Sequence, residues 1–90
     1  MHDWTLLSIL VHWRSRLVEL KFRDLNSQEV IIGVEGFLEL HVPRRDEWGP
    51  SVSVNNVTGP KKLPNGNQRL IIQMQSGDSI DIEASAFKMP

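Results

Sequence analysis

The sequence predicts an all-β fold, namely an antiparallel meander of about seven strands that forms a small sandwich or a partly open barrel. Along most of the chain, apolar and polar residues alternate with a period of two, which is typical of half-buried strands. Clusters rich in Gly, Pro, Asn, Asp and Ser separate these stretches and indicate turns. The chain has 90 residues, of which 40% are hydrophobic and 23% are charged. This size and composition predict one domain, residues 1–90.

The first three strands are expected at residues 4–13, 17–23 and 29–35. A five-residue loop at 24–28 places the apolar residues of the second and third strands on one face, because side chains alternate between the two faces of a sheet. The expected pairs are Phe22 with Val30, Leu20 with Ile32, and Val18 with Val34.

A two-residue turn at Ser15 and Arg16 is expected between the first two strands. This turn places His12 opposite Glu19 on the outer face, and it makes three apolar pairs on the inner face. These pairs are Trp13 with Val18, Val11 with Leu20, and Ile9 with Phe22.

Two further strands are expected at residues 37–42 and 51–57. The segment from Gly33 to Gly36, before the first of them, lies at the end of a strand and is interpreted as a bulge or bend. The segments 43–50 and 58–66 are expected to be long loops because of their Pro and Gly content. The residues expected to face inward are Leu38, Leu40, Val42, Val52 and Val54.

The last hairpin is expected to join residues 69–75 and 79–85. A three-residue loop from Ser76 to Asp78 keeps the apolar residues on one face, whereas a two-residue loop sets Ile72 against Asp81. The expected pairs are Met74 with Ile80, Ile72 with Ile82, and Leu70 with Ala84. Over the whole chain, the residues expected to be buried are Val11, Leu20, Phe22, Ile32, Ile72 and Ile82.

The charge and cysteine content exclude several functional classes. Ten basic and eleven acidic residues leave a net charge of −1. Non-specific nucleic-acid binding depends on a basic surplus, so no nucleic-acid partner is expected. The chain has no cysteine, which excludes disulfides and thiolate chemistry. The sequence has no recognisable signal peptide and no apolar run of about 20 residues, so we expect a cytoplasmic protein without a membrane partner.

No pattern typical of an enzyme is present. The sequence lacks a nucleophile elbow, a phosphate-binding loop and a dinucleotide fingerprint. His2, His12 and His41 do not have the spacing of metal ligands, so neither a metal nor another cofactor is expected. His2 is expected to tie down the start of the first strand. Lys61 and Lys62, and the acidic residues of the last hairpin, are expected to be solvated.

The loop from Pro43 to Pro50 contains the candidate binding site. Its candidate residues are Arg44, Arg45, Asp46, Glu47 and Trp48. Trp and Arg are the residue types that dominate protein interfaces, and loops on a rigid sheet commonly carry function. Two alternatives are open for the tryptophan. It anchors a protein partner, or it folds back and plugs one end of the sheet while the arginines are solvated or paired with the neighbouring carboxylates.

The sequence resembles a group of small uncharacterised bacterial proteins. The similarity lies in residues 2–9, in residues 41–45 and 48–51, and in residues 74–78 and 82–84. It implies an all-β fold and no known activity. Some distantly similar proteins look like immunity proteins of polymorphic toxin systems, and others look like accessory proteins of mobile gene cassettes. Compared with the group, Arg16 replaces a turn glycine and His12 replaces an acidic residue.

These observations favour a non-enzymatic protein-binding module, of which an immunity-type inhibitor is one form. A homo-oligomeric structural or accessory domain is an alternative, in which an exposed strand edge pairs with a second copy. A small-ligand-binding barrel is another, with a pocket between the sheets. The expected partners are therefore a protein of unknown identity or a second copy of the chain.

Overall fold

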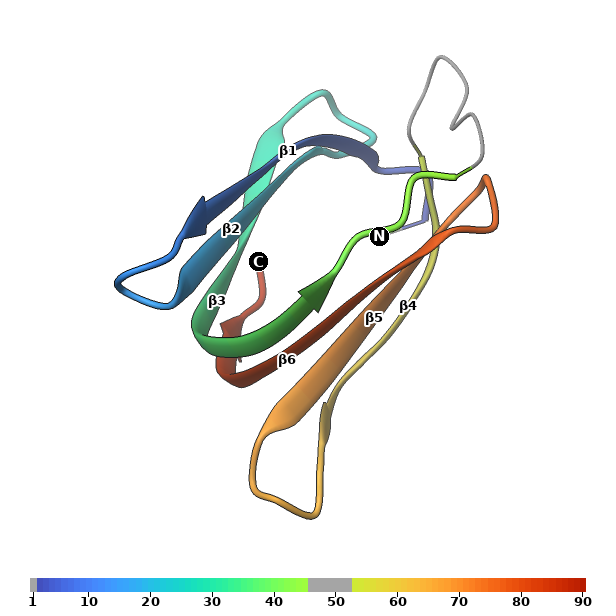
Figure 1. The fold of residues 1–90 in the computed structure, drawn as a ribbon. Helices are drawn as coiled ribbons and strands as arrows, with labels where there is room; N and C mark the ends of the chain where they lie inside the picture. The colour runs from blue at the N-terminus through green and yellow to red at the C-terminus, as the bar shows by residue number, and fades with distance from the viewer. Residues whose placement is uncertain (1, 46–52) are drawn as a thin grey trace.

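A computed structural model describes residues 2–45 and 53–90. These residues form six antiparallel strands in one sheet, so the predicted all-β class is confirmed and the predicted number of about seven strands is too high. The strands are β1 (Thr5–His12), β2 (Leu17–Arg23), β3 (Glu29–His41), β4 (Val54–Lys62), β5 (Gln68–Met74) and β6 (Ser79–Lys88) (Figure 1). Neither described range contains a helix long and apolar enough to cross a membrane.

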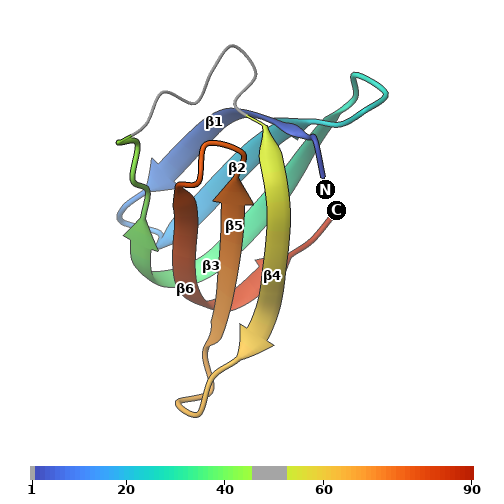
Figure 2. The ribbon, with the colours of Figure 1, turned by 90° about the vertical axis from the view of Figure 1, so that its right-hand side faces the viewer.

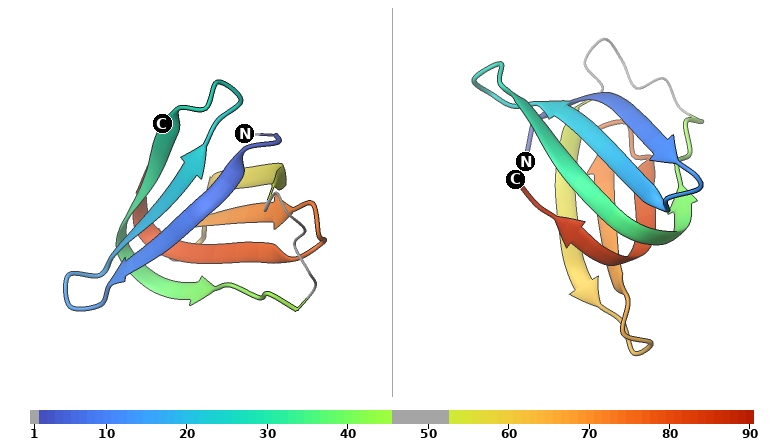
Figure 3. Two further views of the ribbon diagram at one scale, coloured as in Figure 1. Left: turned by 90° about the horizontal axis from the view of Figure 1, so that it is seen from above. Right: turned by 90° about the vertical axis from the view of Figure 1, so that its left-hand side faces the viewer.

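The strand order in the sheet is β1-β2-β3-β6-β5-β4. The chain therefore consists of two three-stranded meanders, β1–β3 and β4–β6, joined by antiparallel pairing of their last strands. This topology is two-fold symmetric, and it leaves β1 and β4 as the two edges of the sheet. The sheet folds over on itself, so that the strands of the two meanders cross in Figure 2, but Figure 3 shows that it does not close into a barrel.

β3 is one continuous strand where the sequence predicts two. Residues 29–35 pair with β2, and residues 33–41 pair with β6. Gly36 has a φ of 63°, in the left-handed region that glycine adopts without steric penalty, and the strand bends there. The hydroxyl of Ser85 in β6 donates a 2.9 Å hydrogen bond to the carbonyl oxygen of Glu35 beside the bend. The bend allows β3 to pair with β2 in one meander and with β6 in the other. One strand therefore replaces the two that the sequence predicts, so the sheet has six strands and not seven.

The predicted pairing of β2 with β3 is confirmed at every position. The loop between them is closed by a 2.9 Å hydrogen bond from the Asp24 amide to the Gln28 carbonyl oxygen. Asp24 Oδ1 also accepts hydrogen bonds from the amides of Asn26 and Gln28, at 2.8 and 2.9 Å. Ser27, the last residue inside the turn, has a φ of 59°. Residues with a side chain are disfavoured in this conformation, so glycine at position 27 would have a lower conformational energy than serine.

We expect the substitution Ser27→Gly to stabilise the protein by roughly 0.5–1 kcal/mol. Relief of the left-handed conformation contributes about 1–2 kcal/mol, and the greater freedom of glycine in the unfolded chain offsets part of it. The midpoint of urea unfolding at unchanged slope measures the effect. The matched control is Gly66→Ala, because Gly66 has a φ of 89° and an added Cβ would meet no atom within 4 Å. This control should lower the midpoint, and a Ser27→Gly variant that also lowers it would contradict the prediction.

The predicted two-residue turn between β1 and β2 is wrong. A four-residue loop, Trp13–Arg16, joins the strands, and the amide of Arg16 donates a 3.3 Å hydrogen bond to the Trp13 carbonyl oxygen. From Ser8 to His12 the register is displaced by two residues, which leaves these side chains on their predicted faces but changes their partners. An irregularity between Leu6 and Ser8 then places Leu6 opposite Phe22 and in the core, whereas the alternation predicts that it faces outward. The observed pairs include Ile9 with Leu20, Val11 with Val18, and His12 with Leu17, so His12 does not lie opposite Glu19.

The predicted pairing of β5 with β6 is also displaced by two residues. The amide of Met74 donates a 2.8 Å hydrogen bond to the Asp78 carbonyl oxygen, so the three-residue turn is 75–77 and not 76–78. Gly77 then occupies the last turn position with a φ of 99°, the place where such turns require a left-handed residue. The observed pairs include Ile72 with Ile80 and Leu70 with Ile82.

β4 extends through most of the segment 58–66 that the sequence predicts to be a loop. Its pairing with β5 is irregular between Val54 and Asn56 and again between Thr58 and Lys61. The second irregularity contains Pro60, which follows a cis peptide bond. Proline is tolerated in a sheet at edge strands and bulges, and this position is both. The connection to β5 is therefore reduced to residues 63–67.

The hydrophobic core lies between the two meanders. Its buried side chains are Leu6, Val18, Leu20, Phe22, Ile32, Val34, Val54, Leu70, Ile72, Met74, Ile80, Ile82 and Ala84. Five of the six predicted core residues are among them, but Val11 is 39% exposed, so its prediction is wrong. Leu38 and Val42 are also exposed, contrary to prediction. An irregularity between Phe37 and Glu39 changes the alternation of β3 there, so that Phe37 and Leu40 pack against the core.

The start of the chain is fastened to the start of β4. Thr5 forms an isolated antiparallel bridge with Ser53. His2 Nδ1 lies 2.7 Å from the carbonyl oxygen of Asn55, which confirms the predicted role of His2. The two edge strands are therefore joined at one end of the sheet by this bridge.

Candidate functional site

The predicted binding loop is described in part. Arg44 and Arg45 are exposed and follow the end of β3. Asp46, Glu47 and Trp48 lie outside the described residues. The two alternatives for Trp48, interface anchor or end plug, therefore both stay predictions.

A different tryptophan is the most exposed large apolar side chain in the described part of the chain. The side chain of Trp13, in the loop between β1 and β2, is 81% exposed. Together with Arg16, Phe37 and Leu38 it lines a hollow of about 200 Å³. We call these four residues the tip patch. Such exposure is unusual for tryptophan, which is largely buried in most folded proteins.

The tip patch is held in place by contacts between the hairpin loop and β3. The amide of Phe37 donates a 3.0 Å hydrogen bond to the carbonyl oxygen of Arg16. The rings of Trp13 and Phe37 meet edge to face, with centroids 6.0 Å apart and an interplanar angle of 65°. Phe37 itself packs against the core. The indole is therefore positioned by an ordered neighbour while most of its surface remains in solvent.

The loop that carries Trp13 is cationic. Arg14 and Arg16 are both exposed, and neither forms an ion pair with a carboxylate of residues 2–45 or 53–90. Leu38, next to them on β3, is 50% exposed. The tip patch thus combines an exposed aromatic ring, an aliphatic neighbour and the guanidinium group of Arg16, and Arg14 lies next to it in the same loop. Both guanidinium groups can bind carboxylates in the two-point geometry characteristic of arginine.

The sequence contains a pattern that points to the tip patch, but the predicted register places its tryptophan inside a strand. Trp13-Arg14-Ser15-Arg16 brings together tryptophan and two arginines, the same residue types that identify the loop after β3. The predicted turn places Trp13 inside a strand and opposite Val18, where it would be buried. In the observed register the residue falls in the loop, so that its side chain is exposed.

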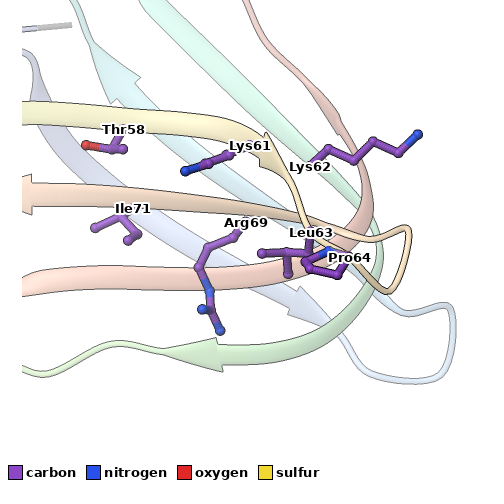
Figure 4. A pocket seen from close by; sticks show the side chains of 7 residues that line it. All are labelled: Thr58, Lys61, Lys62, Leu63, Pro64, Arg69 and Ile71. Carbon is purple, nitrogen blue, oxygen red and sulfur yellow. The ribbon is translucent and has the colours of Figure 1, made fainter.

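A second hollow, of about 580 Å³, lies beside the β4–β5 hairpin. Figure 4 shows the side chains that line it, and Arg69 there is directed towards β6. Arg69 Nε lies 3.1 Å from Asp81 Oδ1, and an Arg69 Nη atom lies 3.7 Å from Glu83 Oε1. The carboxylate of Glu83 also accepts hydrogen bonds from the side-chain amides of Asn65 and Asn67, at 3.1 and 3.3 Å. The charge of Arg69 is therefore compensated within the protein.

The chemistry of this second hollow is limited. Besides Arg69, its lining residues are Thr58, Lys61, Lys62, Leu63, Pro64 and Ile71. This set contains no carboxylate or imidazole that could act as a general base for the Thr58 hydroxyl. The apolar side chains and the two lysines of the lining suit an apolar or anionic group.

Metal-binding geometry is absent from the described residues. Among residues 2–45 and 53–90, no three His, Asp or Glu side chains are grouped so that they could hold a metal ion. Asp81 and Glu83, on the last hairpin, are engaged by Arg69.

Comparison with known proteins shows similarity of fold alone. The chain matches no family model and no curated protein. It is similar to a solved structure, the crystal structure of an uncharacterised protein from Neisseria gonorrhoeae, with a TM-score of 0.74 and 14% sequence identity. The similarity covers 98% of this chain and 90% of the Neisseria protein. A bacterial protein of similar fold therefore exists, as the sequence resemblance implies, and it is itself uncharacterised.

Proposed function

We propose that this domain is a non-enzymatic protein-binding module that uses the tip patch to bind an acidic surface of another protein. The observation that carries the proposal is the 81% exposure of Trp13 beside Arg14 and Arg16, neither of which forms an ion pair with a carboxylate of the described residues. Tryptophan and arginine are the residue types most often found at energetic hot spots. We also place the domain in the cytoplasm, on the sequence features given above.

The energetics of the tip patch support binding. Burial of an aromatic side chain can remove roughly 150–250 Å² from water, which at about 25 cal/mol per Å² contributes several kcal/mol. The contact of Trp13 with Phe37 restricts the indole before a partner arrives. A side chain that is ordered in advance loses less entropy on association, so more of the burial energy appears as affinity.

The chemistry of the patch defines the partner. A complementary surface has an apolar pocket for the Trp13 indole and carboxylates around it for Arg14 and Arg16. A bacterial toxin with such a surface would fit the resemblance to immunity proteins. Arg44 and Arg45 at the end of β3, which the sequence predicts to be part of the main binding surface, would form a second contact region.

We expect Trp13→Ala to abolish binding while the fold is retained. Because the indole is mostly in solvent, its removal should change the free energy of unfolding by no more than about 1 kcal/mol. Loss of a hot-spot tryptophan should weaken binding by at least about 2 kcal/mol, or roughly 30-fold in Kd. The measurement uses the tagged domain to capture proteins from a lysate of its source organism. Each captured protein is then purified and titrated by calorimetry against wild type and variant.

The matched control is Leu25→Ala. Leu25 is 73% exposed in the loop between β2 and β3, outside the tip patch, so its truncation should leave the measured Kd unchanged. Charge reversal at Arg14 and Arg16 should weaken binding and reduce its dependence on salt. A partner whose affinity is insensitive to Trp13→Ala, or equally sensitive to Leu25→Ala, would show that the tip patch is not the binding surface.

A further inference from the structure

The two edges of the sheet occupy equivalent places in the topology but differ in chemistry. β1 and β4 are each the outer strand of one meander. An edge strand presents unpaired backbone amides and carbonyls, and proteins generally block such edges with proline, lysine or bulges. The comparison of β1 with β4 therefore shows which edge is available for pairing.

The β4 edge is blocked in several ways. Pro60 has no backbone amide to donate, and the adjacent pairing with β5 is irregular between Thr58 and Lys61. Lys61 and Lys62 add two positive charges at its end. Each of these features opposes the addition of another strand.

The β1 edge has none of these features over residues 8–12. This segment, Ser-Ile-Leu-Val-His, pairs regularly with β2 and contains no proline, glycine, lysine, arginine or carboxylate. Leu10 on the outer face is 51% exposed, and Val11 on the inner face is 39% exposed. On the side of β1 that faces away from β2, the described residues form one isolated bridge, between Thr5 and Ser53. Thr5 lies at the opposite end of the strand from His12. The edge from Ser8 to His12 thus has apolar side chains at its centre on both faces, and no described residue pairs with its open side.

The sequence of this edge is complementary to itself. In an antiparallel pair about a two-fold axis at Leu10, Leu10 faces its own copy, Ile9 faces Val11, and Ser8 faces His12. Apolar residues meet apolar residues, and polar residues meet polar ones. An axis at Ile9 would instead place Ser8 against Leu10 and bring the irregular position at Leu7 into the pair. The chemistry therefore selects Leu10 as the centre.

We propose that the chain forms a symmetric dimer by antiparallel pairing of β1 with β1 of a second copy, centred on Leu10. The pairing joins two six-stranded sheets edge to edge and covers the exposed parts of Leu10 and Val11. A single self-complementary patch on both copies is the usual form of a two-fold interface. The net charge of −1 produces little repulsion between two copies. This proposal is independent of the tip patch, which consists of other residues.

Disulfide trapping tests the pairing directly, because the natural chain has no cysteine. Facing Cα atoms in antiparallel strands are about 4.5–5.5 Å apart, which lies within the range that a disulfide can span. Under mild oxidation, Leu10→Cys should form a covalent dimer at least tenfold faster than Ile31→Cys. Ile31 is a matched control because it is 47% exposed but lies on β3, away from the edge. A mixture of Ser8→Cys and His12→Cys chains should cross-link with each other in preference to themselves.

Sedimentation equilibrium provides the second test. The wild-type protein should have twice the chain mass of 10.3 kDa at concentrations above its Kd. Leu10→Lys places like charges opposite each other at the axis and should raise the Kd at least tenfold, whereas Ile31→Lys should leave it unchanged. Circular dichroism of both variants confirms that the sheet is intact. A wild-type protein that is monomeric up to its solubility limit, a dimer insensitive to Leu10→Lys, or equal trapping rates at the two cysteine positions would overturn the proposal.

Discussion

Replacement of Leu20 by alanine is expected to lower the free energy of unfolding by about 2–5 kcal/mol. Leu20 is fully buried in β2, where it lies between Ile9 of β1 and Ile32 of β3. Truncation removes apolar contacts and leaves a cavity that the flanking strands can fill only in part. Small domains have a total stability of about 5–15 kcal/mol, so the loss would be a large fraction of it. The midpoint of chemical denaturation measures the effect.

Leu25→Ala is the matched control for Leu20→Ala, because it removes the same atoms from a side chain that is 73% exposed. Its effect should remain within about 0.5 kcal/mol, as for most surface substitutions. An unchanged midpoint for Leu20→Ala would show that Leu20 does not belong to the core. Equal losses in the two variants would mean that the fold has been assigned incorrectly in this region.

The second large effect is expected at Gly59. Gly59 and Gly77 both have a φ of 99°, so alanine at either position carries the same penalty for a left-handed conformation, about 1–2 kcal/mol. At Gly77 an added Cβ meets no atom within 4 Å. At Gly59 it would lie 2.5 Å from the Arg69 carbonyl oxygen and 2.9 Å from the Lys61 amide nitrogen, both of them backbone atoms.

Gly59→Ala should therefore destabilise the protein by about 2–5 kcal/mol, since forced overpacking adds about 1–3 kcal/mol to the conformational penalty. Gly77→Ala serves as the control, and the difference between the two midpoints isolates the clash with the backbone atoms of Arg69 and Lys61. Equal losses at the two positions would show that β4 and β5 do not approach as closely at Gly59 as described.

Where the strands pair regularly, the alternation of apolar and polar residues correctly predicts which side chains share a face but leaves the register open. It fails at the irregularities between Leu6 and Ser8 and between Phe37 and Glu39, where the faces of Leu6 and Leu38 are the opposite of those predicted. A displacement by two residues keeps every side chain on its face, so the alternation is equally satisfied by the predicted and the observed pairings. In the last hairpin the turn determines the register, because only the observed register places Gly77 at the turn position that requires a left-handed conformation. In the β2–β3 hairpin, where the predicted loop length is correct, every pair is correct.

Long-range geometry limits the prediction of β3 and of the candidate site. The sequence contains Gly36, but it does not distinguish a glycine at which a strand ends from a glycine at which a continuous strand bends. Only pairing with β6, far along the chain, shows that the strand continues. Trp13 illustrates the same limit for function, because its exposure follows from a register and from a contact with Phe37 that local patterns do not contain. Arg44 and Arg45 are exposed, in agreement with a binding role, which remains a prediction.

The joining of the two meanders through β3 and β6 has a consequence for the order of folding. Within each meander, neighbouring strands are linked by short loops, so their pairing closes only short stretches of chain. The β3–β6 ladder joins Gly33 to Lys88 and His41 to Asp81, residues that lie roughly half of the chain apart. Closing so long a loop lowers the conformational entropy of the chain, and this unfavourable change precedes the favourable contacts across the core. The ladder between β3 and β6 is therefore the step at which two local hairpin units become one cooperative structure.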